Sequence, residues 1–375
     1  MISCGEPSGD LYAAALVAEL RACEPSTTIF GFGGERMEAA GARLVGNFAG
    51  LSVAGLTEIV RILPQAYAMY RRLVAAAKAD RPDVFVAIDF AGFNFYLLAA
   101  MRRLGVPVVY YVSPQLWAWR PRRMETMKRF VSKVLVIFPF ESTVYERAGV
   151  PVQFVGHPLV DLARTSQPRG EFLRAHGLSP EVPTVALLPG SRRSEVLRIA
   201  PVLASALPLI RTRVPDVQFI VARAPGLADQ MFKALSTSGV TVVDGHADDV
   251  LAASDVVITA SGTATVQAAL HERPMVVVYR VSALSYRLGK PFLNVDTYAM
   301  PNLIAGRRVV PELIQEEFTP ERVAAEAIGL LTDLTRYDAM REALRGVKDR
   351  LGSSGASGRA AAAVLEVAAR GARRA

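Results

Sequence analysis

Short runs of apolar, often β-branched residues recur along the chain, each followed by a small or polar loop and then by apolar residues at helical spacing. Such runs are typical of strands buried on both faces of a parallel sheet, and the stretches between them favour crossover helices. Strands are predicted at 1–4, 29–30, 84–88, 106–112, 134–138 and 152–155, and then at 184–188, 217–222, 241–244, 256–259 and 275–279. The pattern predicts an α/β protein with two Rossmann-like, doubly wound domains that face a cleft.

The alternation of strands and helices is interrupted between residues 162 and 183, where prolines and glycines are typical of a linker with one short helix. A chain of 375 residues suits two domains of ordinary size. We therefore place the first domain at 1–165 and the second at 166–350. The Ala-rich segment at 351–375 has high helix propensity, and we expect a C-terminal helix there that packs back on the first domain.

The loop after the predicted strand at 256–259 carries the clearest ligand-binding chemistry. It consists of four small residues, Ser261, Gly262, Thr263 and Ala264. Because a helical pattern starts there at once, the loop offers backbone N–H groups, hydroxyls and the positive end of a helix dipole to a phosphate or diphosphate. One turn further on, the amide of Gln267 could reach a ribose of the same ligand. An ordinary helix capped by Ser and Thr is the alternative interpretation.

A second strand end in the same half supports the phosphate interpretation. The predicted strand at 184–188 leads into a turn that contains Ser191 and Arg192. A guanidinium pairs with two phosphate oxygens at once, which a lysine ammonium cannot do. Two strand ends with this chemistry together favour a nucleotide diphosphate bound by the second domain.

Acids follow two strand ends in the first half. Glu6 and Ser8 lie in the turn after 1–4, at the start of a predicted helix, and Asp89 follows 84–88. Transfer of a sugar from a nucleotide requires a stabilised diphosphate leaving group and one base that deprotonates the attacking hydroxyl. We predict that Arg192 stabilises the diphosphate and that Asp89 or Glu6 is the base.

Two stretches of the first half have the composition of a membrane-facing surface. Residues 53–79 combine apolar positions at helical spacing with basic residues, and Pro64 within them predicts two helices or one kinked helix. Trp117 and Trp119 precede a basic run at 120–129, and amphipathic rings of this kind are favoured at lipid headgroups. Packing against the protein's own sheet is the alternative for both stretches.

Composition and motifs exclude several other classes. Basic residues exceed acidic ones by 43 − 35 = 8, which suits phosphorylated small molecules or anionic lipid, and without an RNA- or DNA-binding motif we expect no nucleic acid partner. The run Gly31-Phe32-Gly33-Gly34 has Arg36 at the third glycine position of a dinucleotide fingerprint, and no Walker sequence occurs. The four histidines and two cysteines lack metal-ligand spacing, so we expect neither a metal nor a cofactor.

Several motifs are specific enough to point to one family. They are Gly5-Glu6-Pro7-Ser8-Gly9-Asp10, Tyr111-Val112-Ser113-Pro114, Trp117-Ala118-Trp119, Gly156-His157-Pro158, Leu188-Pro189-Gly190-Ser191-Arg192, Ala260-Ser261-Gly262-Thr263-Ala264, Pro274-Met275-Val276-Val277, Tyr279-Arg280 and Pro301-Asn302-Leu303-Ile304-Ala305-Gly306. With these motifs the chain resembles the lipid-A-disaccharide synthases, glycosyltransferases of GT-B fold, nearly from end to end.

The resemblance implies condensation of UDP-2,3-diacylglucosamine with 2,3-diacylglucosamine 1-phosphate (lipid X), which gives the lipid A disaccharide 1-phosphate and UDP. It implies a cytoplasmic protein peripheral to the anionic surface of the inner membrane, without metal or cofactor, and leaves a homodimer open. The lack of a spanning apolar run and of a signal peptide at the first residues agrees with this expectation. By motif position it adds substrate-binding residues, which are Asn94, Ser113, Trp117, Tyr279, Arg280 and Asn302.

Three positions depart from the family's usual pattern. Gly92 stands where the acceptor-side loop usually has a second Asp, Gln267 where the nucleotide helix usually has Glu, and Arg308 where a later loop usually has Glu. If the acid missing at Gly92 is the family's base, Asp89 or Glu6 has to substitute for it. Two alternatives therefore stay open, a related GT-B epimerase or transferase acting on UDP-N-acetylglucosamine and a nucleotide-sugar binder without catalysis.

Overall fold

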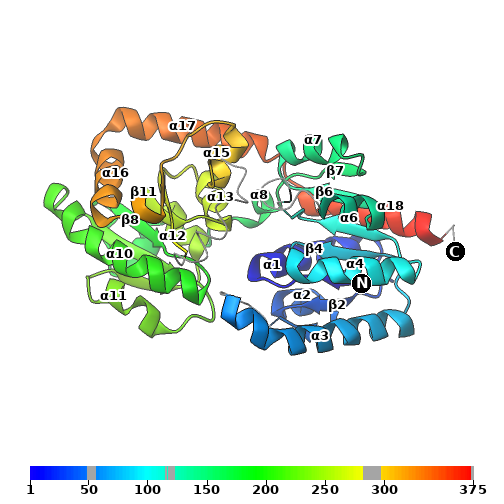
Figure 1. Ribbon diagram of the computed structural model, residues 1–375. Coiled ribbons are helices and arrows are strands. Elements are labelled where there is room, and N and C mark those ends of the chain that lie inside the picture. Colours follow the sequence, from blue (N-terminus) through cyan, green and yellow to red (C-terminus); the bar gives the residue numbers. More distant parts are fainter. Residues whose placement is uncertain (49–55, 115, 117–122, 282–296, 373–375) are drawn as a thin grey trace. The chain divides into compact units, whose positions relative to one another are not determined.

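The computed structural model describes residues 1–48, 56–114, 116, 123–281 and 297–372, with the backbone alone at 56–62 and 372 (Figure 1). The chain divides into two compact units: unit 1 contains Met1–Val160 and Leu351–Ala375, and unit 2 contains Asp161–Arg350. The C-terminal helix α18 (Ala356–Ala372), red in Figure 1, belongs to unit 1 and packs against α1 (Pro7–Cys23).

Unit 1 is built on one parallel sheet. Among its described residues, seven strands follow the order β3-β2-β1-β4-β5-β6-β7. The strands are β1 (Ile2–Ser3), β2 (Phe30–Gly33), β3 (Arg43–Asn47), β4 (Phe85–Ile88), β5 (Val108–Tyr111), β6 (Lys133–Val136) and β7 (Val152–Phe154). Besides α1 and α18, the helices are α2 (Glu35–Ala39), α3 (Leu56–Ala79), α4 (Ala91–Arg103), α6 (Arg123–Phe130), α7 (Pro139–Arg147) and α8 (Leu159–Leu162), which runs into unit 2.

Unit 2 repeats this plan. Its described residues form a six-stranded parallel sheet in the order β10-β9-β8-β11-β12-β13. The strands are β8 (Thr184–Leu188), β9 (Gln218–Arg223), β10 (Thr241–Asp244), β11 (Val256–Ala260), β12 (Met275–Tyr279) and β13 (Glu312–Ile314). The helices are α9 (Arg169–Ala175), α10 (Arg193–Arg213), η1 (Asp229–Phe232), α11 (Lys233–Ser236), α12 (Ala247–Ala253), α13 (Thr263–Leu270), α15 (Met300–Ala305), η3 (Gln315–Glu317), α16 (Pro320–Thr332) and α17 (Leu334–Arg350).

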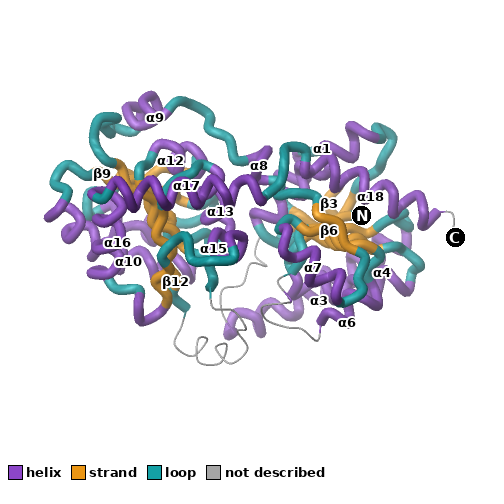
Figure 2. The backbone as a smooth tube through the Cα atoms, turned by 90° about the horizontal axis from the view of Figure 1, so that it is seen from above, coloured by secondary structure: helices purple, strands orange, loops and turns teal. Residues whose placement is uncertain are grey.

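Helices cover both sides of each sheet, so the central strands are buried on both faces (Figure 2). Every residue of β4, β5, β8 and β11 is buried, as their continuous apolar runs predict. Phe85, Tyr110 and Phe219 are among the largest fully buried side chains. Truncation of a buried aromatic side chain to Ala costs about 3–5 kcal/mol. Such packing fixes the strand ends, where the candidate ligand-binding turns lie.

The structure differs from the sequence-based expectation at several elements. The edge strands β3 and β13, which contain partly exposed residues, are not predicted. Strand β2 continues beyond the predicted 29–30 as far as Gly33, and a Cβ on Gly31 would lie only 1.8 Å from the Ile2 carbonyl oxygen, so glycine lets the neighbouring strand approach. One helix, α3, runs through Pro64, which rules out the two-helix alternative. No helix within the described ranges is both long and apolar enough to cross a membrane.

The two sheets have equivalent points at which the strand order changes direction. In unit 1 this point lies between the parallel neighbours β1 and β4, and in unit 2 between β8 and β11. Ligands of doubly wound sheets bind outside the carboxyl ends of the strands at such switch points. The predicted residues Glu6 and Asp89 follow β1 and β4, whereas Arg192 and Gly262 follow β8 and β11.

Candidate functional site

The turn after β11 leaves backbone amide groups open at the start of α13 in unit 2. Gly262 has φ 153°, and a Cβ there would meet nothing within 4 Å, so the space at the start of α13 is open. Among the described residues, no hydrogen bond uses the amide N–H of Gly262, Thr263 or Ala264. The Thr265 hydroxyl donates to the Gly262 carbonyl at 2.7 Å and so fixes the turn. Unbonded N–H groups at a helix start favour a phosphate.

The turn after β8 is already occupied by a carboxylate of the chain itself. Glu195 accepts the backbone N–H groups of Ser191 at 3.1 Å and Arg192 at 3.2 Å, and it also accepts from the Arg192 guanidinium at 3.2 Å. This is a capping box at the start of α10, and a Glu at the third helical position is its signal in the sequence. The backbone N–H groups of Ser191 and Arg192 are thus used within the turn itself. The Arg192 side chain is 44% exposed, so its guanidinium is accessible from solvent.

The end of β12 carries two predicted residues with different environments. Burial raises the pKa of Tyr279, and the negative charge of Glu195 raises it further. The Tyr279 hydroxyl therefore senses the carboxylate that occupies the β8 turn. Arg280 donates to the backbone carbonyls of Gln315 at 3.1 Å and of Phe318, and its guanidinium lies 5.0 Å from the centre of the Phe318 ring. As placed, Arg280 ties the end of β12 to η3.

Gln267 is held by a carboxylate from the neighbouring helix α12. Its amide Nε2 donates to both carboxylate oxygens of Asp248, at 3.2 and 3.1 Å. The same carboxylate lies 2.9 Å from Nε2 of His271, one turn further along α13. Asp248 is a candidate that sequence reasoning missed, although its place in the first turn after strand β10 is the same signal that identified Asp89.

Asn302 uses its whole amide group inside unit 2. It is 1% exposed, and its Nδ2 donates to the Val310 carbonyl at 3.0 Å and to the Glu312 carboxylate at 2.6 Å. Its Oδ1 accepts the N–H groups of Val309 at 2.7 Å and Val310 at 2.9 Å. Asn302 therefore holds the loop after α15, and its predicted contact with substrate stays a prediction.

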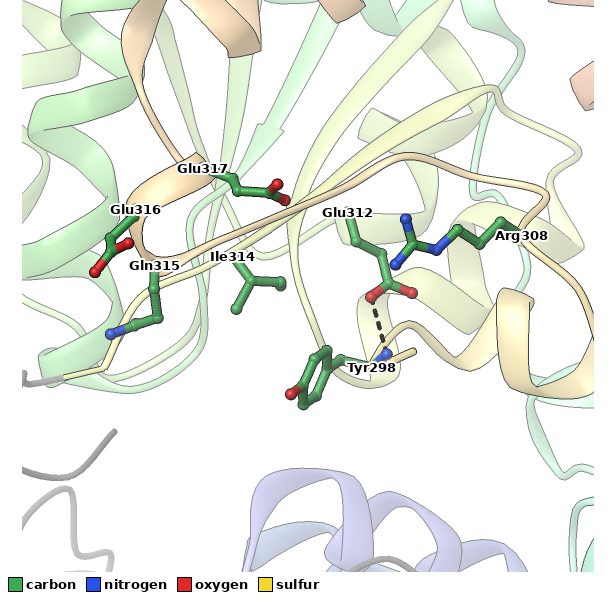
Figure 3. A pocket seen from close by; sticks show the side chains of 7 residues that line it. All are labelled: Tyr298, Arg308, Glu312, Ile314, Gln315, Glu316 and Glu317. Atoms are coloured by element: carbon green, nitrogen blue, oxygen red, sulfur yellow. Dashed lines mark hydrogen bonds between the residues drawn. The ribbon is translucent and has the colours of Figure 1, made fainter. Parts of the chain in front are cut away.

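A cavity of about 230 Å³ opens beside this loop (Figure 3). Its lining residues are Tyr298, Arg308, Glu312, Ile314, Gln315, Glu316 and Glu317. Three glutamates and one arginine make it unfavourable for a diphosphate, because like charges repel. The cavity borders the β11 turn through Tyr298, whose carbonyl accepts from the Ser261 hydroxyl at 3.1 Å and whose N–H donates to Glu312 at 2.9 Å. Through this hydrogen bond, Ser261 fixes the β11 turn against the segment that contains Tyr298.

The turns after β1 and β4 place Glu6 and Asp89 on adjoining loops of unit 1. A Cβ on Gly5 would lie only 2.2 Å from the Phe90 ring, so the two turns pack directly on each other. Glu6 is the N-cap residue of α1, and Ser8 lies in the first turn of that helix. The two candidate bases therefore belong to one local site at the switch point.

Asp89 and Phe90 form a strained turn. Their φ angles are 44° and 48°, and the left-handed conformation costs a non-glycine residue about 1–3 kcal/mol. Asn94 Nδ2 donates to the Asp89 carbonyl at 2.9 Å, and the Tyr110 hydroxyl donates to it at 2.7 Å. Asn94 is 0% exposed and also accepts from Ser3 at 2.7 Å, so its amide holds the backbone of the Asp89 turn, and its predicted contact with substrate stays a prediction. Strain maintained at a strand end indicates a functional turn.

Ser113, which follows β5, lies in a buried polar cluster. Its hydroxyl lies 2.8 Å from the Tyr145 hydroxyl and donates to the Glu141 carboxylate at 3.3 Å. Burial and the Glu141 charge raise the pKa of Tyr145 well above its usual value. Ser113 is 7% exposed, so as placed it joins the end of β5 to α7. The predicted substrate residue Trp117 lies outside the described residues.

His157 is a structural residue. It is 2% exposed, its Nδ1 accepts the Leu159 N–H at 3.1 Å, and its ring contacts those of Tyr12 and Phe138. Burial lowers the pKa of the imidazole to about 3, so the ring is neutral at physiological pH. Within the described ranges, no group of three or more His, Cys, Asp or Glu side chains is arranged to hold a metal ion.

Solved structures share the architecture of both units. UDP-GlcNAc 2-epimerase from Neisseria meningitidis, solved bound to UDP-GlcNAc, matches with a TM-score of 0.68 at 12% identity over 98% of each chain. The glycotransferase of kitacinnamycin matches with a TM-score of 0.61 at 20% identity, again over 98% of each chain. The fold is therefore the GT-B fold of glycosyltransferases and epimerases, and an anion-binding turn at one switch point fits a class that uses nucleotide sugars.

Sequence similarity narrows this class to one family. The family model described as lipid-A-disaccharide synthetase matches residues 1–365. The lipid-A-disaccharide synthase of Geobacter sulfurreducens is 42% identical over 373 residues, which cover 98% of this chain and 96% of that protein. The chain belongs to the lipid-A-disaccharide synthase family, and is thus a glycosyltransferase of lipid A biosynthesis. This membership does not favour the epimerase or the non-catalytic alternative.

Proposed function

We propose that the protein condenses UDP-2,3-diacylglucosamine with 2,3-diacylglucosamine 1-phosphate to give the lipid A disaccharide 1-phosphate and UDP. The observation that supports this most is the open turn at Gly262, where the amide N–H groups at the switch point of unit 2 bond to none of the described residues. Relatives over the whole chain are named lipid-A-disaccharide synthase. Unit 2 is the UDP-sugar domain in this proposal, and unit 1 is the acceptor domain.

The diphosphate binds at the start of α13. The amide N–H groups of Gly262, Thr263 and Ala264 donate to phosphate oxygens, and the helix dipole adds partial positive charge. The Arg192 guanidinium supplies the second contact from the neighbouring turn, and Glu195 orients it through the 3.2 Å hydrogen bond. Negative charge grows on the diphosphate as the sugar departs, so these donors stabilise the transition state.

Asp89 is the general base in unit 1. It takes the proton of the acceptor hydroxyl as that oxygen bonds to the anomeric carbon of the donor sugar, while the bond from that carbon to the diphosphate breaks and UDP leaves. The strained turn supports Asp89 over Glu6, because Asn94 and Tyr110 both fix its backbone. Glu6, on the adjoining turn, then acts on the same acceptor as a binding residue.

The exposed apolar side chains of α3 and α4 form the membrane-facing surface. Leu63 is 58% exposed, Tyr67 is 63% exposed and Tyr96 is 68% exposed, and α3 packs beside α4. Arg71 and Arg72 are exposed on α3, whereas Leu73 and Ala77 face the core. Aromatic and basic side chains together suit an anionic bilayer surface. In the proposal this surface docks on the cytoplasmic side of the inner membrane, where both acylated sugars reside.

The central experiment is a reconstitution of the reaction. The purified protein is mixed with both acylated sugars in detergent, and UDP release and the disaccharide are followed together. We expect both products in equal amounts, and only when both sugars are present. Turnover of unacylated UDP-N-acetylglucosamine without an acceptor, or UDP binding with no product, would overturn the proposal.

The membrane surface is tested separately by flotation with anionic vesicles at low and high salt. Binding at low salt that weakens at high salt is expected, because salt screens the basic residues. A Tyr67→Ser, Tyr96→Ser double variant should float less, with unchanged UDP affinity. Absence of flotation by the parent protein at low salt would contradict the membrane role.

A further inference from the structure

Gln267, Asp248 and His271 form a side-chain cluster between α12 and α13. The Asp248 carboxylate accepts from Gln267 Nε2 with both oxygens, at 3.2 and 3.1 Å, and lies 2.9 Å from His271 Nε2. The side chains of Asp248 and His271 are only 21% and 13% exposed. His271 thus contacts Oδ1 of Asp248, which also accepts from Gln267, and both neighbours hold the carboxylate in a defined geometry.

The chemistry of this contact fixes which way the Gln267 amide faces. An ionised carboxylate only accepts hydrogen bonds, so the NH₂ group of the amide must point toward Asp248. The amide is planar, and its oxygen Oε1 then points to the side away from the carboxylate. Among the described residues, no hydrogen bond uses Gln267 Oε1. The cluster thus presents one oriented acceptor beside the anion-binding turn.

The position of this acceptor matches the sugar part of a nucleotide. Gln267 comes four residues after Thr263, which corresponds to about 6 Å along the helix axis. A diphosphate at the start of α13 places the attached ribose further along the same helix. The hydroxyls of a ribose donate hydrogen bonds, and an acceptor side chain binds them in other doubly wound folds. An amide oxygen held by Asp248 meets this requirement without a second negative charge beside the diphosphate.

We propose that Asp248 is a positioning residue that orients Gln267 Oε1 toward the ribose hydroxyls of the bound nucleotide, with His271 holding Asp248 in place. The proposal rests on the proposed function, because it needs a nucleoside diphosphate at α13. An acceptor oxygen of Gln267 held in this orientation makes the protein selective for ribose nucleotides. Asn at position 248 offers either a donor or an acceptor to the amide, so Gln267 is no longer forced into one orientation.

The test compares the affinities of UDP and 2′,3′-dideoxyuridine diphosphate by titration calorimetry. We expect the parent protein to prefer UDP by about tenfold, which is the value of one good hydrogen bond. The Asp248→Asn variant should keep its melting temperature within a few degrees and show a preference below about threefold. A merely structural role would lower both affinities equally and leave this ratio unchanged.

An exchanged pair gives a second readout. The Asp248→Asn, Gln267→Glu double variant keeps an amide-to-carboxylate hydrogen bond across the same contact and again presents an oriented oxygen to the ribose. It should therefore fold even if Asp248→Asn alone does not, and should recover a preference of about tenfold. An unchanged ratio in Asp248→Asn, or no recovery in the pair, would overturn the inference alone. A parent protein that does not bind UDP would overturn the proposed function itself.

Discussion

The two switch points of this molecule have the same topology and opposite chemistry. In unit 1 the turns after β1 and β4 carry Glu6 and Asp89, and in unit 2 the turns after β8 and β11 carry Arg192 and Gly262. The β4 turn is strained at two non-glycine residues, whereas the β11 turn uses a glycine, and its N–H groups form no hydrogen bond within the described part of the chain. One backbone plan therefore supplies a carboxylate in one unit and, in the other, open amide groups that we propose bind the diphosphate.

The comparison also shows how each unit maintains its chemistry. In unit 1, buried side chains donate hydrogen bonds to the Asp89 carbonyl. These bonds fix the backbone from which the Asp89 carboxylate extends. Unit 2 uses a carboxylate differently, since Glu195 fills the β8 turn and orients Arg192. Division of labour between a base and a leaving-group site is what sugar transfer requires.

The largest effect is expected for Asp89→Asn. Removal of a general base lowers kcat by about 10²- to 10⁴-fold, while UDP affinity should stay within about twofold of the parent value because the proposal assigns UDP to unit 2. Steady-state kinetics with both acylated sugars and calorimetry with UDP measure the two quantities. Glu6→Gln is the matched control, and we expect it to raise KM for the acceptor more than it lowers kcat. If Glu6→Gln loses kcat and Asp89→Asn does not, the base is Glu6.

Arg192→Ala is expected to have the next largest effect. Loss of the guanidinium removes a donor to the developing diphosphate charge, and the rate should fall by at least about tenfold. Arg193→Ala removes the same charge from the next position of α10 and is the control for a general electrostatic effect. Equal kinetics of the two variants would exclude a specific diphosphate contact by Arg192.

Gly262→Ala tests the unit 2 turn through its backbone. A Cβ at this position meets no atom of the described residues within 4 Å, but it occupies the space where the proposal brings phosphate oxygens to the N–H groups, so UDP affinity should fall about fivefold. Gly177→Ala is the matched control, because Gly177 has φ 72° and equally open surroundings after α9. Calorimetry on both variants separates the effects. A similar loss of affinity in Gly177→Ala would mean that backbone strain, and not the phosphate contact, is responsible.

The smallest effect on activity is expected for His157→Asn, because the buried ring of His157 has a structural role. This variant should instead change how stability depends on pH. Burial holds the pKa of His157 at about 3 in the folded protein, below about 6.5 in the unfolded chain. Its contribution to stability is therefore complete above pH 6.5 and is lost as the pH falls toward 3. Between pH 6.5 and 5 the parent should lose about 2 kcal/mol more unfolding free energy than His157→Asn. Denaturant titrations at both pH values measure this difference, and parallel losses would contradict it.

The sequence predicts the central strands and the turns that follow them, because strands buried on both faces leave continuous apolar runs. The partly exposed strands β3 and β13 leave no such run. The strand-end rule also locates Asp89, Arg192 and the Gly262 turn. It cannot tell which polar side chains turn inward, since their partners are distant in sequence. Asn94 accepts a hydrogen bond from Ser3, 91 residues away, and a contact over that separation cannot be predicted from residue spacing.

Gln267 and Glu195 show the same limit at the site itself. The sequence places Gln267 one turn into the nucleotide helix, but its partner Asp248 comes from another helix, 19 residues earlier. Glu195 is local to Arg192 and follows from the capping-box pattern, so its role was within reach of sequence reasoning. Local hydrogen bonds can thus be predicted from spacing, while tertiary ones require the packed structure.

The most direct measurement is a crystal structure of the protein with UDP. Phosphate oxygens should lie within about 3.2 Å of the amide nitrogens of Gly262–Ala264 and of the Arg192 guanidinium, with no nucleotide on the Asp89 turn of unit 1. A diphosphate bound in unit 1, or one in unit 2 that contacts neither Arg192 nor the start of α13, would contradict the assignment of opposite roles to the two switch points.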